Sequence, residues 1–477
     1  MKFLFLYALL SSTFLSAQLS SYQYPLGHWY GQLTIAGKQF EILFFVQPVY
    51  KSGSNKTIKN RYHMELLNPE DSSAYPFLVT SLNISAKKFE FEIKDLNLKY
   101  TSKPSVSKTE LNGTFEQNGF TSNLIFGRSR FHLKKPDRPQ TPKPPYAYHI
   151  REVKIPHIRE NFNLAGTLTL PADTTAPFPL VVMASGSGPQ DRDEEILDHR
   201  MFLVLADYLA RNGVGSLRFD DRGVGNSGGV FKAASLVGFS EDVESVFDFL
   251  KKSPVFAEYK TGILGHSEGA MHAWMVAKRR SDVDFIISLA GPAVSGAQII
   301  EQQQYDIAIL QSEEQALWVR DLFRGIIDIV SKNPDAAMCI KKTEKFIKYY
   351  HKKSSKTIKD KNPLRPLMQT LPTFLNSAWG REFLAWSPDD YLPNYKGGVL
   401  YIIGDKDIQV NPDLNFNGFL KYIKNYKVGS LGALRYENLN HLLQTCKTCT
   451  LEEYAELEET ISPVVMSEIL IFLKRSI

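Results

Sequence analysis

The chain has 477 residues, of which 43% are hydrophobic and 22% charged, and its formal net charge is only +5. Such values are typical of a globular protein with two or three domains. The basic residues are scattered along the chain rather than clustered, so the charge pattern argues against a nucleic-acid partner.

Residues 1–17 have the pattern of a signal peptide. Lys2 gives the positive start, Phe3–Leu10 form the apolar run, and two small residues precede the expected cleavage before Gln18. An uncleaved membrane anchor is the alternative, but Ser11–Thr13 interrupt a stretch that is already short for a membrane span. We therefore expect an exported protein, periplasmic or secreted, with no stable membrane insertion after cleavage.

Residues 22–133 alternate apolar and polar side chains with a period of two, in short runs separated by turn-rich pieces. Phe40–Val46 and Lys88–Ile93 are examples. This pattern predicts a small antiparallel β domain, either a sandwich or an open barrel. Five of its aromatic residues are expected in its core rather than on a ligand-binding platform. They are Trp29, Tyr30, Phe44, Phe45 and Phe115.

Residues 134–147 contain five prolines, which predicts an extended, semi-stiff linker and a domain boundary. From residue 148 to residue 477, predicted strands alternate with predicted helices. The strands are Leu164–Leu170, Pro179–Ala184, Val214–Phe219, Gly262–Leu264, Phe285–Leu289 and Gly398–Ile403. The helices are His199–Arg211, Ser240–Lys251, Ala270–Lys278 and Leu451–Leu473. Such alternation predicts an α/β domain whose mostly parallel sheet is covered by helices on both faces.

Residues 294–395 break this alternation. The region is rich in polar residues, has helical periodicity and contains no convincing strand. Because it lies between two predicted core strands, we interpret it as a helical insertion.

The sequence Gly265-His266-Ser267-Glu268-Gly269 stands between a predicted strand and a predicted helix. The two glycines allow a sharp turn that a β-carbon would obstruct, and the turn lifts the serine hydroxyl above the sheet. Ser267 is therefore the candidate nucleophile, with an ordinary turn serine as the alternative.

A serine hydroxyl needs a neighbouring base, and the base needs an orienting acid. His441 is the preferred base because it follows a strand end before the last predicted helix, whereas His266 is expected to point away from Ser267. Asp407 is the preferred acid, in the loop after Gly398–Ile403, and Asp405 is the alternative. Eight other histidines are less suitable by position: His28, His63, His132, His149, His157, His199, His272 and His351.

An oxyanion hole needs two backbone N–H donors. The expected donors are Glu268, which follows the nucleophile, and Ser187 in the glycine-rich loop Ser185–Asp193. A second glycine-rich stretch, Asp220–Gly229, lacks the further signals of a dinucleotide or phosphate site. We interpret it as a turn in which Asp221 or Arg222 braces the active-site loops.

The sequence contains three cysteines, Cys339, Cys446 and Cys449. In an exported chain the Cys446–Cys449 spacing suits a local disulfide, while free thiols and metal or redox chemistry remain open alternatives.

Together, these motifs resemble those of bacterial α/β-hydrolase-fold serine esterases, in particular an exported group with an extra β-rich N-terminal domain. The motifs are Ser185–Asp193, Asp221–Ser227, Gly265–Gly269, Gly404–Val410 and Asn440–Gln444, and less specifically Trp29–Leu33 and Leu111–Gln117. The resemblance implies Ser267 as nucleophile, Asp407 as acid, His441 as base and residues 294–395 as a lid. Two departures from the family pattern are Ser185, where many members have His, and the cysteine pair after the base.

The sequence thus predicts an exported serine carboxylesterase acting on small esters of short to medium acyl chains, without a metal or organic cofactor. A serine peptidase acting on short peptides uses the same fold and triad and stays an alternative. A non-catalytic binding protein is a remoter one. The sequence gives no oligomeric state.

Overall fold

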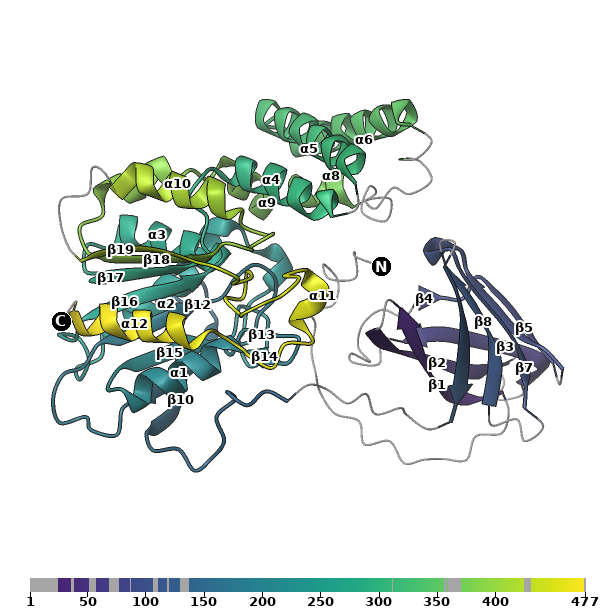
Figure 1. The fold of residues 1–477 in the computed structure, drawn as a ribbon, viewed down its shortest axis with the longest axis horizontal. Coiled ribbons are helices and arrows are strands. Elements are labelled where there is room, and N and C mark those ends of the chain that lie inside the picture. Colours follow the sequence, from purple (N-terminus) through teal and green to yellow (C-terminus); the bar gives the residue numbers. More distant parts are fainter. Residues whose placement is uncertain are drawn as a thin grey trace. The chain divides into compact units, whose positions relative to one another are not determined.

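A computed structural model describes residues 25–35, 38–50, 57–67, 77–85, 87–105, 110–117, 120–128, 137–310, 312–355, 358, 370–423 and 430–475. They form two compact units that divide near residue 136 (Figure 1). We call them the N-terminal unit and the C-terminal unit. The predicted signal peptide, residues 1–17, lies outside the described residues.

The N-terminal unit is a single antiparallel sheet with the strand order β4-β3-β2-β1-β9-β8-β7-β6-β5. The strands are β1 (Gly27–Ile35), β2 (Lys38–Tyr50), β3 (Thr57–Leu67), β4 (Phe77–Leu78), β5 (Ser81–Ile84), β6 (Phe89–Ile93), β7 (Leu98–Pro104), β8 (Glu110–Gln117) and β9 (Phe120–Gly127). A short 3-10 helix, η2 (Lys94–Leu96), joins β6 to β7.

Aromatic side chains fill the interior of this sheet. Phe44 on β2 stacks on Phe89 of β6 with ring centroids 5.4 Å apart, although β1, β9, β8 and β7 separate these strands in the sheet. Such contact across the interior requires a curled sheet, so the open barrel is the right one of the two expected architectures. Trp29, Phe44 and Phe115 are buried in its core, as predicted, while Tyr30 is half-buried and the side chain of Phe45 is not among those described.

The C-terminal unit is built on an eight-stranded sheet with the order β10-β11-β15-β12-β16-β17-β18-β19. Its strands are β10 (His149–Pro156), β11 (Asn163–Leu170), β12 (Leu180–Ala184), β15 (Gly215–Phe219), β16 (Thr261–His266), β17 (Phe285–Leu289), β18 (Gly398–Gly404) and β19 (Leu431–Tyr436). The six strands from β15 to β19 in this order are parallel, and β10 and β11 are antiparallel to their neighbours. A small hairpin of β13 (Glu195–Ile196) and β14 (His199–Arg200) stands apart from it.

Helices cover both faces of this sheet. Side chains of successive residues along a strand point to opposite faces of the sheet, so neighbouring residues pack against helices on opposite sides. Val182 and Ile263 pack with α2 (Leu236–Lys251), α3 (Glu268–Arg279) and α10 (Pro412–Ile423). Val181 and Leu264 pack with α1 (Met201–Arg211) and α12 (Pro463–Arg475) on the other face (Figure 1). The predicted α/β-hydrolase fold is confirmed.

The predicted helix Leu451–Leu473 is wrong as a continuous element. The structure has α11 (Leu451–Tyr454), a connecting segment, and then α12 from Pro463. Proline has no N–H and suits the first turn of a helix rather than its interior. In the connection, the N–H groups of Thr460 and Ile461 donate to Oε1 of Gln140 at 2.5 and 3.1 Å instead of to helix carbonyls.

Residues between β17 and β18 form the predicted insertion, and the described part of it is helical. It contains α4 (Gly296–Ile309), α5 (Glu313–Lys332), α6 (Ala336–Lys353), α8 (Leu371–Leu375), α9 (Ala378–Ala385), η4 (Pro388–Asp390) and η5 (Leu392–Asn394). Figure 1 shows α5, α6 and α8 grouped together. They share a small core of their own, which includes Trp318, Leu322, Ile347 and Leu375.

The described part of the proline-rich stretch 134–147 is attached to the C-terminal unit. The Arg138 guanidinium donates to the carbonyls of Leu457 and Ala455 at 2.6 and 2.9 Å. Gln140 donates from Nε2 to the Ile461 carbonyl at 2.7 Å. This part of the stretch therefore helps to hold the segment between α11 and α12.

Within the described ranges, no helix has the length and apolarity that crossing a bilayer requires. Among the described side chains, no group of three or more His, Cys, Asp or Glu is arranged to hold a metal ion.

Candidate active site

Ser267 occupies the turn between β16 and α3. Its backbone angles, φ of +52° and ψ of −122°, lie in a region that residues other than glycine rarely adopt. Its N–H donates to the Leu289 carbonyl at 2.9 Å, and its carbonyl accepts the N–H of Ala270 at 3.1 Å. The strained turn is therefore held from both sides, as a nucleophile elbow requires.

The two glycines that flank this turn are required by close backbone packing. A β-carbon on Gly265 would lie 2.3 Å from the carbonyl carbon of Gly269. One on Gly269 would lie 2.0 Å from the carbonyl oxygen of Ala184, the last residue of β12. The turn thus packs directly on the end of the neighbouring strand, where the loop that begins at Ser185 leaves the sheet.

The preferred acid and base are brought together. Nδ1 of His441 lies 2.7 Å from Oδ2 of Asp407, and the two side chains are 6% and 0% exposed. Oδ1 of Asp407 accepts the N–H groups of Gln409 and Val410, each at 2.8 Å. The carboxylate is thereby fixed in the orientation that faces the imidazole.

The alternative acid lies elsewhere. Oδ1 of Asp405 accepts the N–H of Asn438 at 2.6 Å, and its other oxygen lies 3.7 Å from the Lys406 ammonium. Asp405 therefore connects the loop after β18 to the loop after β19, and the ring of His441 is bonded by Asp407 instead.

The main chain of His441 is held at both its polar groups. Its carbonyl lies 3.0 Å from Nε2 of His266, and its N–H donates to the hydroxyl of Tyr454 at 3.4 Å. The rings of His266 and His441 are 4.9 Å apart between centroids. Because His266 directly precedes Ser267, this contact joins the turn at Ser267 to the loop that follows β19 and carries His441, which we call the base loop. The two ring nitrogens of His266 thus contact Glu194 and the main chain of His441.

The loop after β12 approaches the nucleophile closely. A β-carbon on Gly186 would lie 3.2 Å from Cβ of Ser267. The N–H of Gly186 donates to Oε1 of Glu194 at 2.7 Å. With that amide already bonded, the N–H of Ser187 remains the candidate donor of this loop, and the N–H of Glu268 at the start of α3 remains the other candidate.

Asp221 braces the loop Ser185–Asp193, which carries the candidate donor Ser187 and which we call the oxyanion loop. Its Oδ2 accepts the N–H of Gln190 at 2.9 Å, and its own N–H donates to the Gln190 carbonyl at 3.1 Å. Enclosure by protein atoms raises the pKa of Asp221 well above its ordinary value, and the nearby carboxylates of Glu194 and Glu268 act in the same direction. Of the two bracing residues that we expected, Asp221 contacts the loop.

Arg222 serves a different part of the unit. Its guanidinium donates to both oxygens of Asp242 on α2, at 2.6 and 2.9 Å, and to Glu160 at 2.9 Å. A second arginine that the sequence did not single out, Arg192, braces the oxyanion loop instead. It donates from Nε and Nη2 to the two oxygens of Asp220 at 2.9 and 2.7 Å.

The side chain of Glu268 is buried and faces the insertion. Its Oε1 accepts the indole N–H of Trp379 on α9 at 3.0 Å and lies 3.4 Å from Nε2 of His272, one turn further along α3. The insertion therefore contacts the residue that directly follows Ser267.

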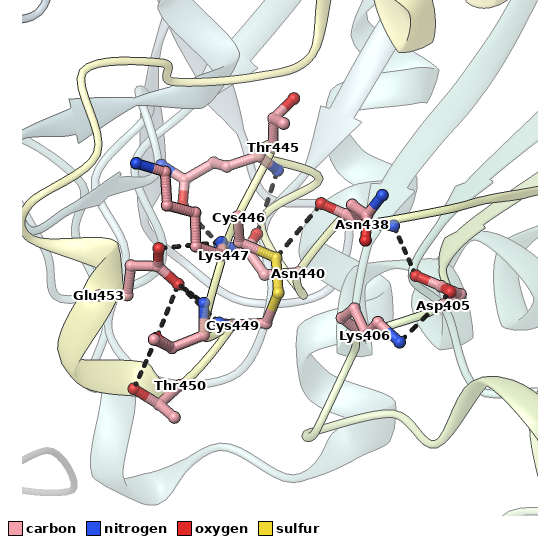
Figure 2. The surroundings of a disulfide bond; sticks show 12 residues. Asp405, Lys406, Asn438, Asn440, Thr445, Cys446, Lys447, Cys449, Thr450 and Glu453 are labelled. Atoms are coloured by element: carbon pink, nitrogen blue, oxygen red, sulfur yellow. Dashed lines mark hydrogen bonds and ion pairs between the residues drawn. A yellow bond between two sulfur atoms is a disulfide. The ribbon is translucent and has the colours of Figure 1, made fainter.

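The cysteine pair after the base forms a disulfide, with Cα atoms 5.0 Å apart (Figure 2). The Cys446 Sγ lies 3.2 Å from the carbonyl of Asn438. Glu453 accepts the N–H groups of Lys447, Thr448 and Cys449 at 2.9, 2.8 and 2.5 Å (Figure 2). The disulfide loop is thus bonded to α11, the helix whose Tyr454 contacts the main chain of His441. Cys339 is a buried free thiol in the insertion.

Three residues near the site carried no clear sequence signal. Glu194 and Tyr454 lie 72 residues before His266 and 13 residues after His441, outside any motif. Trp379 stands in the insertion. Only the positive φ of +50° at Glu194 marks it as unusual, and that is a property of the folded backbone.

The chain is similar in sequence to known hydrolases. Residues 199–361, about a third of the chain, match the family model described as serine aminopeptidase, S33. The chain is similar to the esterase EstD of Thermotoga maritima, with 26% identity over 221 residues. That similarity covers 45% of this chain and 48% of EstD, so the chain spans about half the length of this relative. The predicted resemblance to α/β-hydrolase esterases is confirmed.

The chain also aligns with the solved structures of two esterases. Pf2001 from Pyrococcus furiosus has a TM-score of 0.40 and 16% identity, over 72% of this chain and 99% of Pf2001. Est1E from Butyrivibrio proteoclasticus, solved with ferulic acid bound, has a TM-score of 0.38 and 17% identity, over 68% of this chain and 99% of Est1E.

Proposed function

We propose that this α/β-hydrolase-fold chain is a serine carboxylesterase that hydrolyses small esters of short to medium acyl chains. The observation that carries the proposal is the meeting of three loops at one strained serine. The Ser267 turn contacts the oxyanion loop through Gly186 and the base loop through His266, and the base itself is bonded to Asp407. Similarity to EstD, which is named an esterase, supports the same reaction class.

In the proposed reaction, Oγ of Ser267 attacks the ester carbonyl while Nε2 of His441 takes its proton. The N–H groups of Ser187 and Glu268 stabilise the oxyanion, and losing one such donor typically costs ~3 kcal/mol of barrier. His441 then returns the proton to the leaving alcohol. Asp407 keeps the imidazole in the tautomer with hydrogen on Nδ1. Water, activated by His441, hydrolyses the acyl-enzyme and restores Ser267. All these steps use groups of the protein.

The insertion acts in this scheme as the lid that selects the acyl group. Two contacts support this role. The indole N–H of Trp379 on α9 donates to Glu268. Asn411, which lies in the same loop as Asp407, donates its side-chain N–H to Asp306 on α4 at 2.8 Å. The insertion thus contacts the residues that follow both the nucleophile and the acid.

A chain-length series of p-nitrophenyl esters, from acetate to laurate, tests the proposal with wild type and Ser267→Ala. We expect the wild type to prefer the shorter esters and the variant to lose at least about 10³-fold in kcat. A fluorophosphonate probe should label wild type at Ser267 and leave the variant unlabelled. Equal turnover by both proteins would contradict the mechanism.

A serine peptidase is the second candidate, favoured by the description of the matching family model. Aminoacyl-anilides assayed beside p-nitrophenyl acetate separate the two activities. Anilide cleavage with negligible ester turnover would replace the esterase proposal. Failure of the fluorophosphonate to react with the folded wild type would favour the remoter alternative, a non-catalytic binding protein.

We also propose that the protein is exported. The residue pattern of positions 1–17 supports export, and so does the Cys446–Cys449 disulfide, since such bonds persist in oxidising compartments. Cell fractionation with N-terminal sequencing tests this: the mature protein should begin at Gln18 and be absent from the cytoplasm.

A further inference from the structure

We propose that Glu194 and His266 are a pair of positioning residues, which together hold the oxyanion loop and the base loop on the two sides of Ser267. The inference rests on the proposed function, since it assigns a role toward the same nucleophile. Both side chains are buried, with exposures of 0% for Glu194 and 2% for His266. The reaction scheme above uses neither of them.

The pair links loops that are far apart in sequence. Oε1 of Glu194 accepts the N–H of Gly186 at 2.7 Å and lies 2.8 Å from Nδ1 of His266. Nε2 of His266 lies 3.0 Å from the carbonyl oxygen of His441. A continuous chain of three hydrogen bonds therefore runs from the oxyanion loop to the base loop, and it passes through the residue that precedes Ser267.

The partners of His266 determine its protons. A carbonyl oxygen only accepts, so Nε2 must carry hydrogen to bond to His441. Oε1 of Glu194 already accepts from Gly186, so the Nδ1 contact also needs a proton, held between the imidazole and the carboxylate. Burial lowers the pKa of His266, but the charge and hydrogen bond of Glu194 outweigh burial and raise it above the ordinary value. The raised pKa of His266 favours a proton on each of its ring nitrogens, with Nδ1 facing Oε1 of Glu194.

The local backbone is shaped to admit this pair. Glu194 has a φ of +50°, an unusual conformation for a residue with a side chain, and its N–H donates to the Asp191 carbonyl at 3.0 Å. A β-carbon on Gly186 would lie 3.1 Å from Oε1 of Glu194. Glycine at this position therefore lets the carboxylate, the loop and Ser267 approach one another.

Two anchors then fix the base. Asp407 holds the ring of His441 through Nδ1, and His266 holds its carbonyl, so ring and backbone are positioned independently. Through Gly186, the same pair fixes the amide next to the candidate donor Ser187. Misplacing a reacting group by about 1 Å can lower a rate 10²-fold, so loss of the pair should reduce catalysis while the substrate contacts persist.

The test compares Glu194→Gln, His266→Gln and the double variant with wild type in hydrolysis of p-nitrophenyl butyrate. Fluorophosphonate titration of Ser267 normalises each kcat to the folded fraction. We expect each single variant to lose about 10²-fold in kcat, with KM within about threefold of wild type. Inhibition by a boronic acid, which resembles the tetrahedral intermediate, should weaken by a similar factor. The double variant should be no slower than the worse single one, because the two residues act as one unit.

His157→Gln is the matched control. His157 is also buried beside a carboxylate, with Nε2 3.2 Å from Asp242, and its Nδ1 accepts the N–H groups of Arg159 and Glu160 rather than contacting a catalytic loop. It should keep its kcat even where its melting temperature falls. The proposal is overturned if the Glu194 and His266 variants keep kcat within about twofold of wild type. It is also overturned if their kcat falls only as much as that of His157→Gln at an equal loss of stability. A wild type without Ser267-dependent turnover would instead overturn the proposed function.

Discussion

Oδ2 of Asp407 lies 2.7 Å from Nδ1 of His441, and the other oxygen of the same carboxylate accepts two backbone N–H groups. The backbone thus orients the candidate acid, and this carboxylate in turn orients the ring of the candidate base. Asp407→Asn would place either an amide N–H or a weaker acceptor against Nδ1 of His441. The change would favour the imidazole tautomer with hydrogen on Nε2, which cannot take a proton from Ser267. If the proposed triad is right, we expect kcat to fall about 10⁴-fold, as for the same change in known Ser-His-Asp enzymes, with little change in folding.

Asp405→Asn is the control for that change, because Asp405 has the same chemistry two residues earlier but bonds to Asn438. Its kcat should stay within about tenfold of wild type. Steady-state kinetics on one ester measures both variants. A larger loss from Asp405→Asn than from Asp407→Asn would show that the acid has been misassigned.

Gly269→Ala tests the packing of the nucleophile turn. The new β-carbon would lie 2.0 Å from the carbonyl oxygen of Ala184, a backbone atom that cannot yield without moving β12. We expect a loss of about 3 kcal/mol in unfolding free energy or failure to fold, with kcat reduced in any folded protein. Gly127→Ala, where a β-carbon meets nothing within 4 Å, should unfold in urea like wild type. Equal stability of the two variants would refute the packing argument.

We expect His199 to make the stability of the C-terminal unit depend on pH. Burial lowers its pKa from 6.5 to about 4. Its partners, the Tyr454 carbonyl at 2.8 Å and the Thr460 hydroxyl at 3.2 Å, satisfy a neutral ring. Between pH 6.5 and pH 4 the unfolded chain binds a proton that the folded chain does not. Stability is therefore complete above this window and falls as the pH drops through it, by up to about 3 kcal/mol.

Urea unfolding of wild type and His199→Gln at pH 7 and about pH 4.5 measures this effect. The variant lacks the titrating ring, so its stability should fall less than that of wild type over the same interval. Parallel losses in the two proteins would assign the acid sensitivity to other groups.

The Cys446–Cys449 disulfide should contribute to stability more than to catalysis. Closing so short a loop restricts the unfolded chain by about 2 kcal/mol on chain-entropy arguments. Glu453 also binds three amides of this loop, so its shape should survive the loss of the bond. In Cys446→Ala/Cys449→Ala we expect a lower melting temperature and a kcat within about threefold of wild type.

Dithiothreitol provides the matching measurement on the wild type. It should lower the melting temperature of wild type toward that of the double variant and leave the variant unchanged. Cys339→Ala, which removes the buried free thiol of the insertion, should respond to the reductant as wild type does. Thiol counting verifies that the reductant has broken the bond. An unchanged melting temperature of the reduced wild type would then contradict the prediction.

Local signals in the sequence were enough to predict the positions of Ser267, Asp407 and His441 in the fold. Each follows a strand of a parallel sheet, and the carboxyl ends of such strands meet at one edge. The choice of Asp407 over Asp405 used only its place in the loop, and the structure bonds Asp407 to His441. The glycines at 265 and 269 were expected for the same local reason, a turn too tight for β-carbons.

Contacts between distant segments could not be predicted in this way. Glu194 meets His266 across 72 residues, and the Trp379 contact with Glu268 spans 111. Neither contact produces a periodicity or a fixed residue spacing that could be recognised in the sequence. The break before Pro463 was missed for a related reason, because the apolar pattern on both sides continues while the backbone turns to bond with Gln140. The choice between barrel and sandwich likewise depended on contacts across the interior, such as that of Phe44 with Phe89.

The insertion enters after β17 and leaves into β18, two strands that pair directly with each other. Ser267 and the oxyanion loop precede it in the chain, while Asp407 and His441 follow it. A single proteolytic cut within the insertion would therefore divide the candidate catalytic residues between two fragments that the sheet still joins. Because the two ends of the insertion lie on paired strands, the length of the insertion does not set the positions of the strands that precede the candidate catalytic residues.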